Sequence, residues 1–314
     1  MRVSPRFAVI PNEFMAKCTP FSARGWTTDS FRPRTLRGPR SVAFAIVPGA
    51  GPPRHGPSTM APSPSSFDAH APAEGFRLKG DAKLAFVTDM FDRVAPTYDL
   101  LNWFISLGQT TLWRLMALSW LHPRLRPRAK VLDVGCGTGW VTWYFRRRYA
   151  ALDLDVVGMD CSPVMLDEAR RVVPGADFRR GDVCALDHPD DTFDLVTTVY
   201  TLRNFPDLRE GVREMYRVTA PGGAVVILDA FPASNPAMRA ALYLWLECVM
   251  PFVAALFTKD AKAYRYLSAS IRSTIPPGEV AEMLRECGAE EVSTTKYTFG
   301  AAARIVASKP KRAA

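Results

Sequence analysis

The hydrophobic positions between residues 130 and 229 follow two alternating patterns. Nearly continuous apolar runs at 131–134, 156–159, 193–199 and 224–229 are typical of buried strands, and much of the sequence between them carries apolar residues at helical spacing. Alternating strands and helices of this kind predict a parallel sheet covered by helices on both faces. We therefore expect an α/β fold over this part of the chain.

The flanking segments extend the predicted sheet and cover one of its edges. Helical patterns lie before the first strand at 82–91, 100–105 and 109–121. We expect these helices to form a lid over the carboxyl edge of the strands. Near the end of the chain, a short helix and two further strands are predicted at 280–284, 292–299 and 303–307. With a further strand predicted at 178–183, the complete prediction is a Rossmann-like, seven-stranded, mostly parallel sheet with an antiparallel last strand.

A glycine-rich turn follows the first predicted strand directly. Gly135, Gly137 and Gly139 can adopt positive φ and let a ligand approach the backbone, while the helix that follows points its N–H groups at that ligand. A dinucleotide fingerprint, G-x-G-x-x-G, would need a glycine at 140, where Trp140 stands. The spacing G-x-G-x-G fits S-adenosylmethionine better, so we predict this cofactor, with Asp133 at the strand end among its contacts.

Two more strand ends carry acidic residues at the same predicted edge. Asp160 ends the second strand, about twenty residues after the glycine turn, where it can accept hydrogen bonds from a ribose diol. Asp182 and Val183 lie at the end of the third strand, predicted at 178–183, and are expected beside the adenine. Cys161 and Val199, at the ends of the second and fourth strands, complete the predicted cofactor contacts. The alternative is that these are ordinary strand-to-helix turns, in which Gly and Asp are common.

A short polar segment follows the fourth strand, before a helix predicted at 208–218 and the sequence 220–223 that ends it. It contains Arg203 and Asn204 between apolar residues, at the sheet edge where ligands bind in such folds. The functional reading is a substrate contact, and the alternative is a solvated loop. Tyr98 and Asn102 are polar residues in an otherwise apolar stretch, and Asp99 there is read equally as a helix cap or a functional residue.

The basic excess lies in the first part of the chain. Residues 1–80 contribute +7 of the net charge of +9 and hold twelve prolines without sustained periodicity. This composition predicts a disordered extension that resembles an organelle transit peptide, followed by one domain at 81–314. A mis-assigned gene start is the alternative. Because the domain is nearly neutral, the basic pI does not indicate nucleic-acid binding.

The cysteines, histidines and apolar segments exclude several other classes of protein. The six cysteines form no C-x-x-C pair and the four histidines are scattered, so we predict neither disulfides nor a metal site. The apolar segment 237–257 is interrupted by Glu247 and Pro251 and is too short to cross a membrane. It is expected as an amphipathic helix pair that covers a lipophilic substrate or lies on a bilayer, or as ordinary core.

Several motifs together resemble one family. They are Phe91-Asp92-x-Val94-Ala95-x-x-Tyr98-Asp99-x-x-Asn102, the glycine turn, Leu202-Arg203-Asn204, Glu214-Met215-Tyr216-Arg217-Val218 with Pro221-Gly222-Gly223, and Ala263-Tyr264-x-Tyr266-Leu267-x-x-Ser270-Ile271. From about residue 82 to 309, the chain is similar to the ubiquinone/menaquinone biosynthesis C-methyltransferases, a class I S-adenosylmethionine-dependent family. The segments 106–109 and 116–120 are most similar to the plastid and cyanobacterial branch that methylates demethylphylloquinol.

This resemblance implies particular roles and a particular compartment. It implies cofactor contacts at Thr138, Asp160, Asp182 and Val183, and catalytic or substrate-side roles for Tyr98, Arg203 and Asn204. The implied substrate is a lipophilic prenylated or phytylated quinol, with peripheral membrane contact and no nucleic acid as partners. A plastid location is expected. A mitochondrial location is the alternative, or the cytoplasmic side of a membrane if the extension is a mis-assigned start. A homodimer is left open.

The sequence departs from the family pattern near the expected substrate side. Trp140 stands where the family usually has Asp, Ser268 replaces a common Pro, and the segments 229–231 and 300–308 differ most. For the chemistry we expect Arg203 with Asn204 to stabilise a developing phenolate, because a guanidinium stays protonated and is a poor base. Water, including water bonded to Asp160, would take the phenolic proton. Alternatives are a ubiquinone-pathway benzoquinol, another small phenol or polyketide, or a non-catalytic scaffold.

Overall fold

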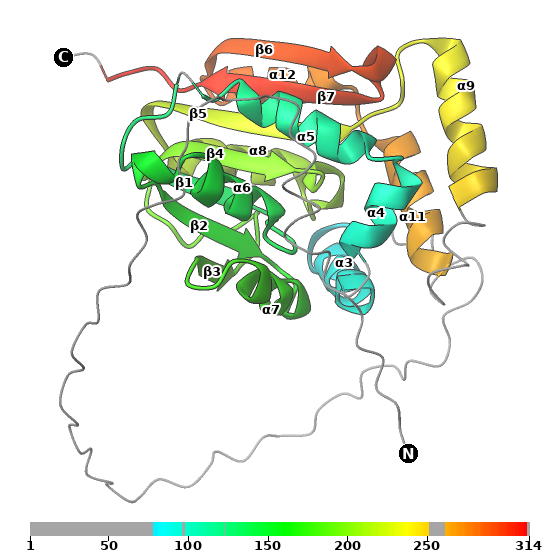
Figure 1. Cartoon of the computed structure of the whole chain (residues 1–314). Helices are drawn as coiled ribbons and strands as arrows, with labels where there is room; N and C mark the ends of the chain where they lie inside the picture. Colours follow the sequence, from blue (N-terminus) through cyan, green and yellow to red (C-terminus); the bar gives the residue numbers. More distant parts are fainter. Residues whose placement is uncertain (1–77, 96–97, 123, 251–260, 313–314) are drawn as a thin grey trace, which may run out of the picture. The chain divides into compact units, whose positions relative to one another are not determined.

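The computed structural model describes residues 78–95, 98–122, 124–250 and 261–312 (Figure 1). The predicted extension at 1–80 lies almost wholly outside these ranges. Residues 251–257, in the second half of the predicted helix pair at 237–257, also lie outside the described residues. The described residues all belong to one compact unit.

The sheet has seven strands in the order β3-β2-β1-β4-β5-β7-β6. Their bounds are β1 Lys130–Val134, β2 Asp155–Asp160, β3 Asp177–Arg180, β4 Phe193–Val199, β5 Thr219–Ala230, β6 Glu290–Tyr297 and β7 Ala302–Ser308. The pairs from β3 to β5 are parallel, whereas β7 is antiparallel to both β5 and β6. The predicted topology, with an antiparallel last strand, is therefore confirmed.

The fifth strand begins earlier than the sequence predicts. Gly222 and Gly223 were expected to end the preceding helix, but they lie within β5. The amide of Gly222 donates to the carbonyl of Lys309, and the amide of Lys309 donates to the carbonyl of Gly223, both at 2.9 Å. Pairing with the chain just after β7 thus keeps this glycine-containing segment extended.

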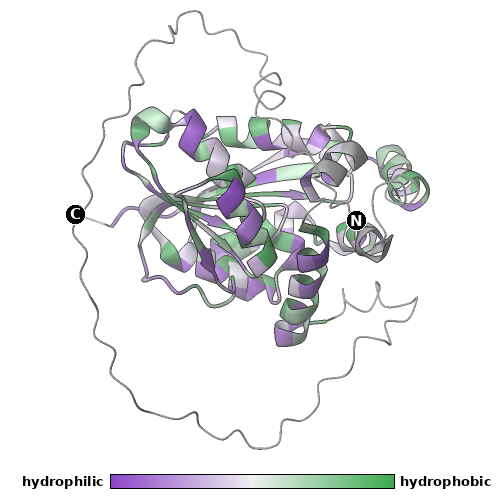
Figure 2. Cartoon of the chain, turned by 60° about the horizontal axis from the view of Figure 1, so that its bottom comes forward, coloured by the Kyte–Doolittle hydropathy of each residue, from purple (hydrophilic) through white to green (hydrophobic). Residues whose placement is uncertain are grey.

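Helices cover both faces of the sheet. They are α6 Trp140–Arg148, α7 Pro163–Val172, α8 Leu208–Val218 and α12 Pro277–Glu286, with the 3₁₀ turns Ala150–Leu152, Leu202–Asn204 (η3) and Thr298–Gly300. Figure 1 shows α6 in front of the strands, and α8 and α12 behind them. The largest apolar core lies between the strands and α8 and α12, where Val212, Met215 and Leu284 are fully buried. In Figure 2, the outer helices carry both hydrophilic and hydrophobic residues.

A second group of helices lies at the carboxyl edge of the strands. These are α3 Gly80–Val94, α4 Tyr98–Ile105, α9 Pro236–Leu244 and α11 Ala261–Ser273, whereas α5 Gln109–Ser119 runs from this edge back across the sheet (Figure 1). α9 continues into one π-helical stretch, η4 Trp245–Val249. The predicted helices before β1 are confirmed, with α3 and α4 beginning two residues earlier than expected. Within the described ranges, no helix has the length and apolar character needed to cross a bilayer.

Candidate active site

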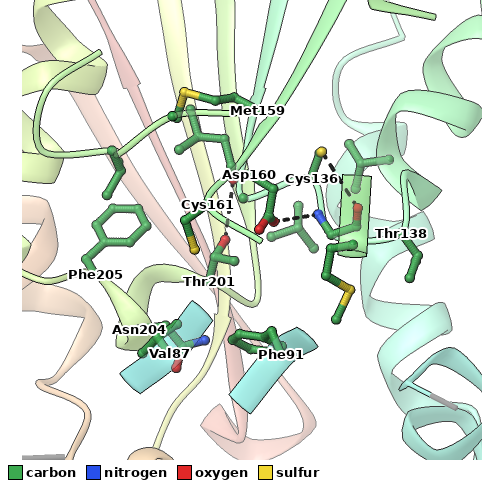
Figure 3. A pocket seen from close by; sticks show the side chains of 18 of the residues that line it. Val87, Phe91, Cys136, Thr138, Met159, Asp160, Cys161, Thr201, Asn204 and Phe205 are labelled. Carbon is green, nitrogen blue, oxygen red and sulfur yellow. Dashed lines mark hydrogen bonds between the residues drawn. The ribbon is translucent and has the colours of Figure 1, made fainter. Parts of the chain in front are cut away.

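A cavity of about 850 Å³ opens at the carboxyl ends of β1, β2 and β4, and we call it the cofactor cavity. Side chains of Leu84, Val87 and Phe91 from α3 line it opposite the strand ends, so the predicted lid is confirmed for this helix. Figure 3 shows Val87 and Phe91 facing the group of Asp160 and Thr201. Of the predicted cofactor contacts, the following line the cavity: Gly135, Gly137, Thr138, Asp160, Cys161, Asp182, Val183 and Val199.

The glycine turn forms the floor of this cavity. Gly135 and Gly137 have φ of +67° and +53°, values that residues with a Cβ atom rarely adopt. A Cβ added at Gly135 would lie 2.4 Å from Cγ2 of Thr201, whereas one at Gly137 would meet nothing within 4 Å. The backbone at Gly137 is therefore open to a ligand, as the sequence predicted.

Asp160 is held rigidly at the end of β2. Its Oδ2 accepts a hydrogen bond from the amide of Gly137 (Figure 3) and its Oδ1 accepts one from the amide of Ser162, both at 2.9 Å. Burial raises the pKa of Asp160, and these two amide bonds oppose the rise. The carboxylate thus joins the glycine turn to the start of α7 and keeps acceptor capacity for a diol.

Two of the predicted cofactor contacts do not line the cavity. Asp133 is 1% exposed and points to the other side of β1, where its Oδ2 accepts from Oγ1 of Thr142 at 3.0 Å. A Cβ at Gly139 would lie 3.1 Å from both the Cβ of Ala169 and the ring of Phe178. Asp133 and Gly139 thus support the turn from behind, and their assignment as cofactor contacts stays a prediction.

The start of α4 closes the cavity near the glycine turn. Oδ2 of Asp99 accepts a hydrogen bond from Oγ1 of Thr138 at 2.6 Å, which ties α4 to the turn. Tyr98, the first residue of α4, lines the cofactor cavity and two neighbouring cavities. Burial raises the pKa of Tyr98, and the charges of Arg203 and Arg114 oppose that rise. Its hydroxyl therefore stays protonated and can donate a hydrogen bond.

Arg203 is not in a solvated loop. Its side chain is 7% exposed, and its Nη1 donates to Oδ1 of Asp229 at 2.5 Å. Nε of Arg203 and Oδ2 of Asp229 are buried without hydrogen-bond partners among the described residues. Arg203 lines the two cavities beside the cofactor cavity but not the cofactor cavity itself. The pair thus has an unused hydrogen-bond donor and an unused acceptor beside these two cavities.

Asn204 connects the cofactor cavity to a smaller cavity between α3, η3 and α11. It lines both, and its Oδ1 accepts from the hydroxyl of Tyr266 at 3.2 Å. Its Nδ2 is buried without a partner in the described part of the chain. Burial raises the pKa of Tyr266 to about 12, so this hydroxyl is a donor at neutral pH. An amide with a free donor at this place can bind an oxygen atom of a ligand.

A larger and mainly apolar cavity of about 1240 Å³ lies beside the cofactor cavity, and we call it the apolar cavity. Apolar side chains from α9, η4 and α11 line it, and they include Met238, Leu242, Trp245, Leu246, Leu267 and Ile271. Tyr98 and Arg114 line both this cavity and the cofactor cavity. The two spaces therefore share a wall made of a hydroxyl and a guanidinium.

Sequence reasoning did not identify Arg114 and Asp229 as functional candidates. Asp229 carries the signal that was used for Asp160, an acid at the end of an apolar strand. Arg114 is a single cation within the apolar pattern at 109–121, which is a weaker signal. Within the described ranges, no cluster of three or more His, Cys, Asp or Glu side chains could hold a metal ion.

The residues of the cofactor cavity fit S-adenosylmethionine. Gly137 gives open backbone, Asp160 a fixed carboxylate acceptor for the ribose, and Asp182 a second carboxylate beside Val183 for the adenine edge. Arg114 adds a cation at the wall. These are the polar groups that an adenosyl ligand with an amino-acid tail requires, although the individual contacts stay predictions.

Comparison with known proteins gives consistent matches. The model of the ubiE/COQ5 methyltransferase family matches residues 78–309. The chain is 37% identical to the demethylmenaquinone methyltransferase of Deinococcus radiodurans over 71% of this chain and 92% of the relative. It is 36% identical to the enzyme of that name from Thermus thermophilus over 70% of this chain and 100% of the relative. A solved SAM-dependent methyltransferase from Thermotoga maritima is 22% identical, covering 70% and 99% of the two chains with a TM-score of 0.49.

Proposed function

The chain belongs to the ubiE/COQ5 methyltransferase family, and from this membership we propose that it methylates a ring carbon of a lipophilic naphthoquinol, using S-adenosylmethionine. The observation that carries this proposal is the shared wall of the cofactor cavity and the apolar cavity. Tyr98 and Arg114 border both spaces. A methyl donor and an apolar acceptor bound in them would meet at this wall, and such positioning supplies much of the rate in a two-substrate reaction.

Tyr98, from the shared wall, and Arg203, which lines the apolar cavity beside it, suit a phenolate intermediate of the acceptor. Methylation at carbon needs a nucleophilic ring carbon, which a quinol provides after one hydroxyl loses its proton to water. Arg203 stays charged and has an unpartnered Nε, so it can stabilise the phenolate oxygen. The protonated hydroxyl of Tyr98 can donate to the same oxygen or to its counterpart across the ring. When bound, S-adenosylmethionine supplies an electrophilic methyl group on its sulfonium.

The relatives support a naphthoquinol ring, and the lining of the apolar cavity supports a lipophilic tail on that ring. The curated relatives named above are demethylmenaquinone methyltransferases. The lining of Met238, Leu242, Leu246 and Ile271 provides an apolar environment for a prenyl or phytyl tail. A demethylphylloquinol type acceptor is the finer proposal. A ubiquinone-pathway benzoquinol and another small lipophilic phenol are the competing acceptors.

Contact with a membrane surface is part of the proposal, since the acceptor is carried in a bilayer. Leu107 lines the apolar cavity and is 71% exposed. Leu244 at the end of α9 and Phe299 before β7 are 63% and 68% exposed. Large apolar side chains of this kind favour insertion at a bilayer interface. Co-sedimentation with anionic vesicles should fall when Leu107 and Phe299 are replaced by Ser.

Delivery to a plastid is proposed for the residues that precede the family match. The match begins at residue 78, and residues 1–80 carry the acid-poor composition described above. A fluorescent protein fused to residues 1–80 should enter plastids. Entry into mitochondria would favour the alternative, and retention in the cytosol would contradict targeting.

The acceptor can be identified with the purified full-length chain. We expect methyl label from S-adenosylmethionine to appear on a reduced demethylnaphthoquinone with a prenyl or phytyl tail, at a much higher kcat/KM than on a benzoquinol or a short phenol. Quinone profiling of a deletion strain should show the demethyl precursor. Cofactor binding without any methylated product would favour the non-catalytic scaffold.

A further inference from the structure

Arg114 is the only basic side chain among the described residues that line the cofactor cavity. It lies in the middle of α5, between Thr110 and Leu118, on a helix whose buried residues, Trp113, Ala117 and Leu118, are all apolar. The cavity also contains the acidic side chains of Asp160 and Asp182. An anionic group of a ligand in this cavity therefore has one side-chain cation available to it.

The guanidinium of Arg114 lacks an acidic partner in the described part of the chain. Its Cζ lies 5.1 Å from the ring centre of Trp140 and 5.2 Å from that of Tyr200. Its Nε is buried and has no hydrogen-bond partner there. Aromatic faces stabilise a cation by about 0.5–2 kcal/mol, but they do not replace hydrogen bonds to its N–H groups. A partly buried, unpartnered guanidinium is thus ready for an anion.

The order of the strands places this cation at one end of the cofactor cavity. Asp160 and Asp182 follow β2 and β3, whereas Tyr200 follows β4 on the other side of β1. Trp140 begins α6, directly after the glycine turn. If Asp160 binds the ribose and Asp182 the adenine edge, the amino-acid part of the cofactor extends across β1 toward Arg114.

We propose that Arg114 binds the carboxylate of the methionine part of S-adenosylmethionine. The inference rests on the assignment of this cofactor and is independent of which quinol is methylated. The planar guanidinium can donate two parallel hydrogen bonds to a carboxylate, while Trp140 and Tyr200 hold its plane. The competing role is contact with the phenolate of the acceptor, because Arg114 also lines the apolar cavity.

Binding measurements with two ligands separate these roles. Isothermal titration of the full chain with S-adenosylmethionine and with decarboxylated S-adenosylmethionine compares ligands that differ in the carboxylate alone. Arg114→Met should weaken binding of S-adenosylmethionine about 10- to 100-fold, because the hydrogen bonds from the guanidinium to the carboxylate are lost. Binding of the decarboxylated ligand should change less than about threefold, because it never used the guanidinium. Arg114→Lys should give an intermediate loss for the first ligand.

The matched control is Arg124→Met. Arg124 also lies against an aromatic face, with its Cζ 3.7 Å from the ring centre of Trp120, but it is exposed and lines none of the three cavities. Its replacement should change neither affinity. The ratio of the two affinities within one variant does not depend on the fraction of folded protein. Equal losses for both ligands in Arg114→Met, or no loss for either, would overturn the proposal.

The result is also separable from the proposed function. Failure of the chain to methylate any quinol would leave both titrations interpretable, because neither includes an acceptor. A change confined to the KM for quinol, with both cofactor affinities unchanged, would assign Arg114 to the acceptor and reject the carboxylate site.

Discussion

Nη1 of Arg203 lies 2.5 Å from Oδ1 of Asp229, and both side chains are buried at the end of β5, where Asp229 has no exposed surface. Removing one partner leaves the other as a buried, uncompensated charge, which destabilises a protein by about 3–5 kcal/mol. We expect Arg203→Ala and Asp229→Ala each to lower the free energy of unfolding by that amount. The double variant should lose less than the sum. Urea unfolding measures all three, and strictly additive losses would mean that the pair is not coupled.

Arg203 can also be tested for catalysis without leaving Asp229 unpaired. Arg203→Lys keeps the positive charge beside Asp229 but loses the planar fork and the Nε donor, which is buried without a partner among the described residues. We expect kcat to fall about 10- to 100-fold, the loss of one or two charge-assisted hydrogen bonds in the transition state. The dissociation constant for S-adenosylmethionine should stay the same, since Arg203 does not line the cofactor cavity. Equal losses in both would contradict a role confined to the acceptor.

Replacement of Asp160 should reduce the affinity for the cofactor far more than it reduces the stability of the fold. Asp160→Asn keeps one oxygen that can accept from Gly137 or Ser162, but it removes the negative charge and one acceptor. Loss of charge-assisted bonds to a ribose is expected to weaken S-adenosylmethionine binding about 10- to 100-fold. The control, Asp187→Asn, removes an exposed carboxylate that does not line the cofactor cavity and should leave binding unchanged. Unchanged affinity in Asp160→Asn would reject its role as the ribose ligand.

Asp133 makes the stability of the protein depend on pH. Burial raises the pKa of Asp133 from 3.8 to about 7, an effect opposed by the bonds from Thr142 and Thr197 and increased by the charge of Asp160. Between these two values the folded chain binds more protons than the unfolded chain. The free energy of unfolding should therefore fall as the pH rises through this range, and level off above it.

The variant Asp133→Asn tests this account. A neutral amide resembles the protonated carboxyl, so the variant should lose most of a pH-dependent change of about 4 kcal/mol. A smaller slope should remain from Asp160, whose pKa burial also raises. Urea unfolding at several pH values from 4 to 8 measures the slope, with Asp187→Asn as a control that retains the wild-type slope. An unchanged slope in Asp133→Asn would assign the effect to other groups.

The parallel strands and the glycine turn were predictable because they depend on local patterns. Apolar runs mark β1, β2 and β4, and the spacing of Gly135 and Gly137 marks the turn between β1 and α6. The antiparallel β7 was predicted from its place at the end of the chain. The start of β5 was predicted too late, because pairing with Lys309 from the far end of the chain decides it.

The side-chain orientations at the candidate site were not predictable for a related reason. A sequence shows that Asp133 lies at a strand end but not that its side chain faces α6 and Thr142 instead of the cavity. Likewise, the burial of Arg203 depends on Asp229, 26 residues away. Tyr266 reaches Asn204 across 62 residues. These contacts arise from tertiary packing, which single-sequence patterns do not contain.

Gly135 should tolerate a side chain much less than Gly137, although both have positive φ. Alanine at Gly137 meets open space, so it should lower the free energy of unfolding by about 1–2 kcal/mol of backbone strain alone. Alanine at Gly135 adds a clash with Thr201, with three side-chain atoms at 2.4–2.8 Å, and overpacking adds about 1–3 kcal/mol. Removing two of those atoms, in Gly135→Ala with Thr201→Ala, should recover part of the loss. Urea unfolding of the three variants measures this difference, and equal losses for the two single glycine variants would contradict the close approach of Thr201 to the turn.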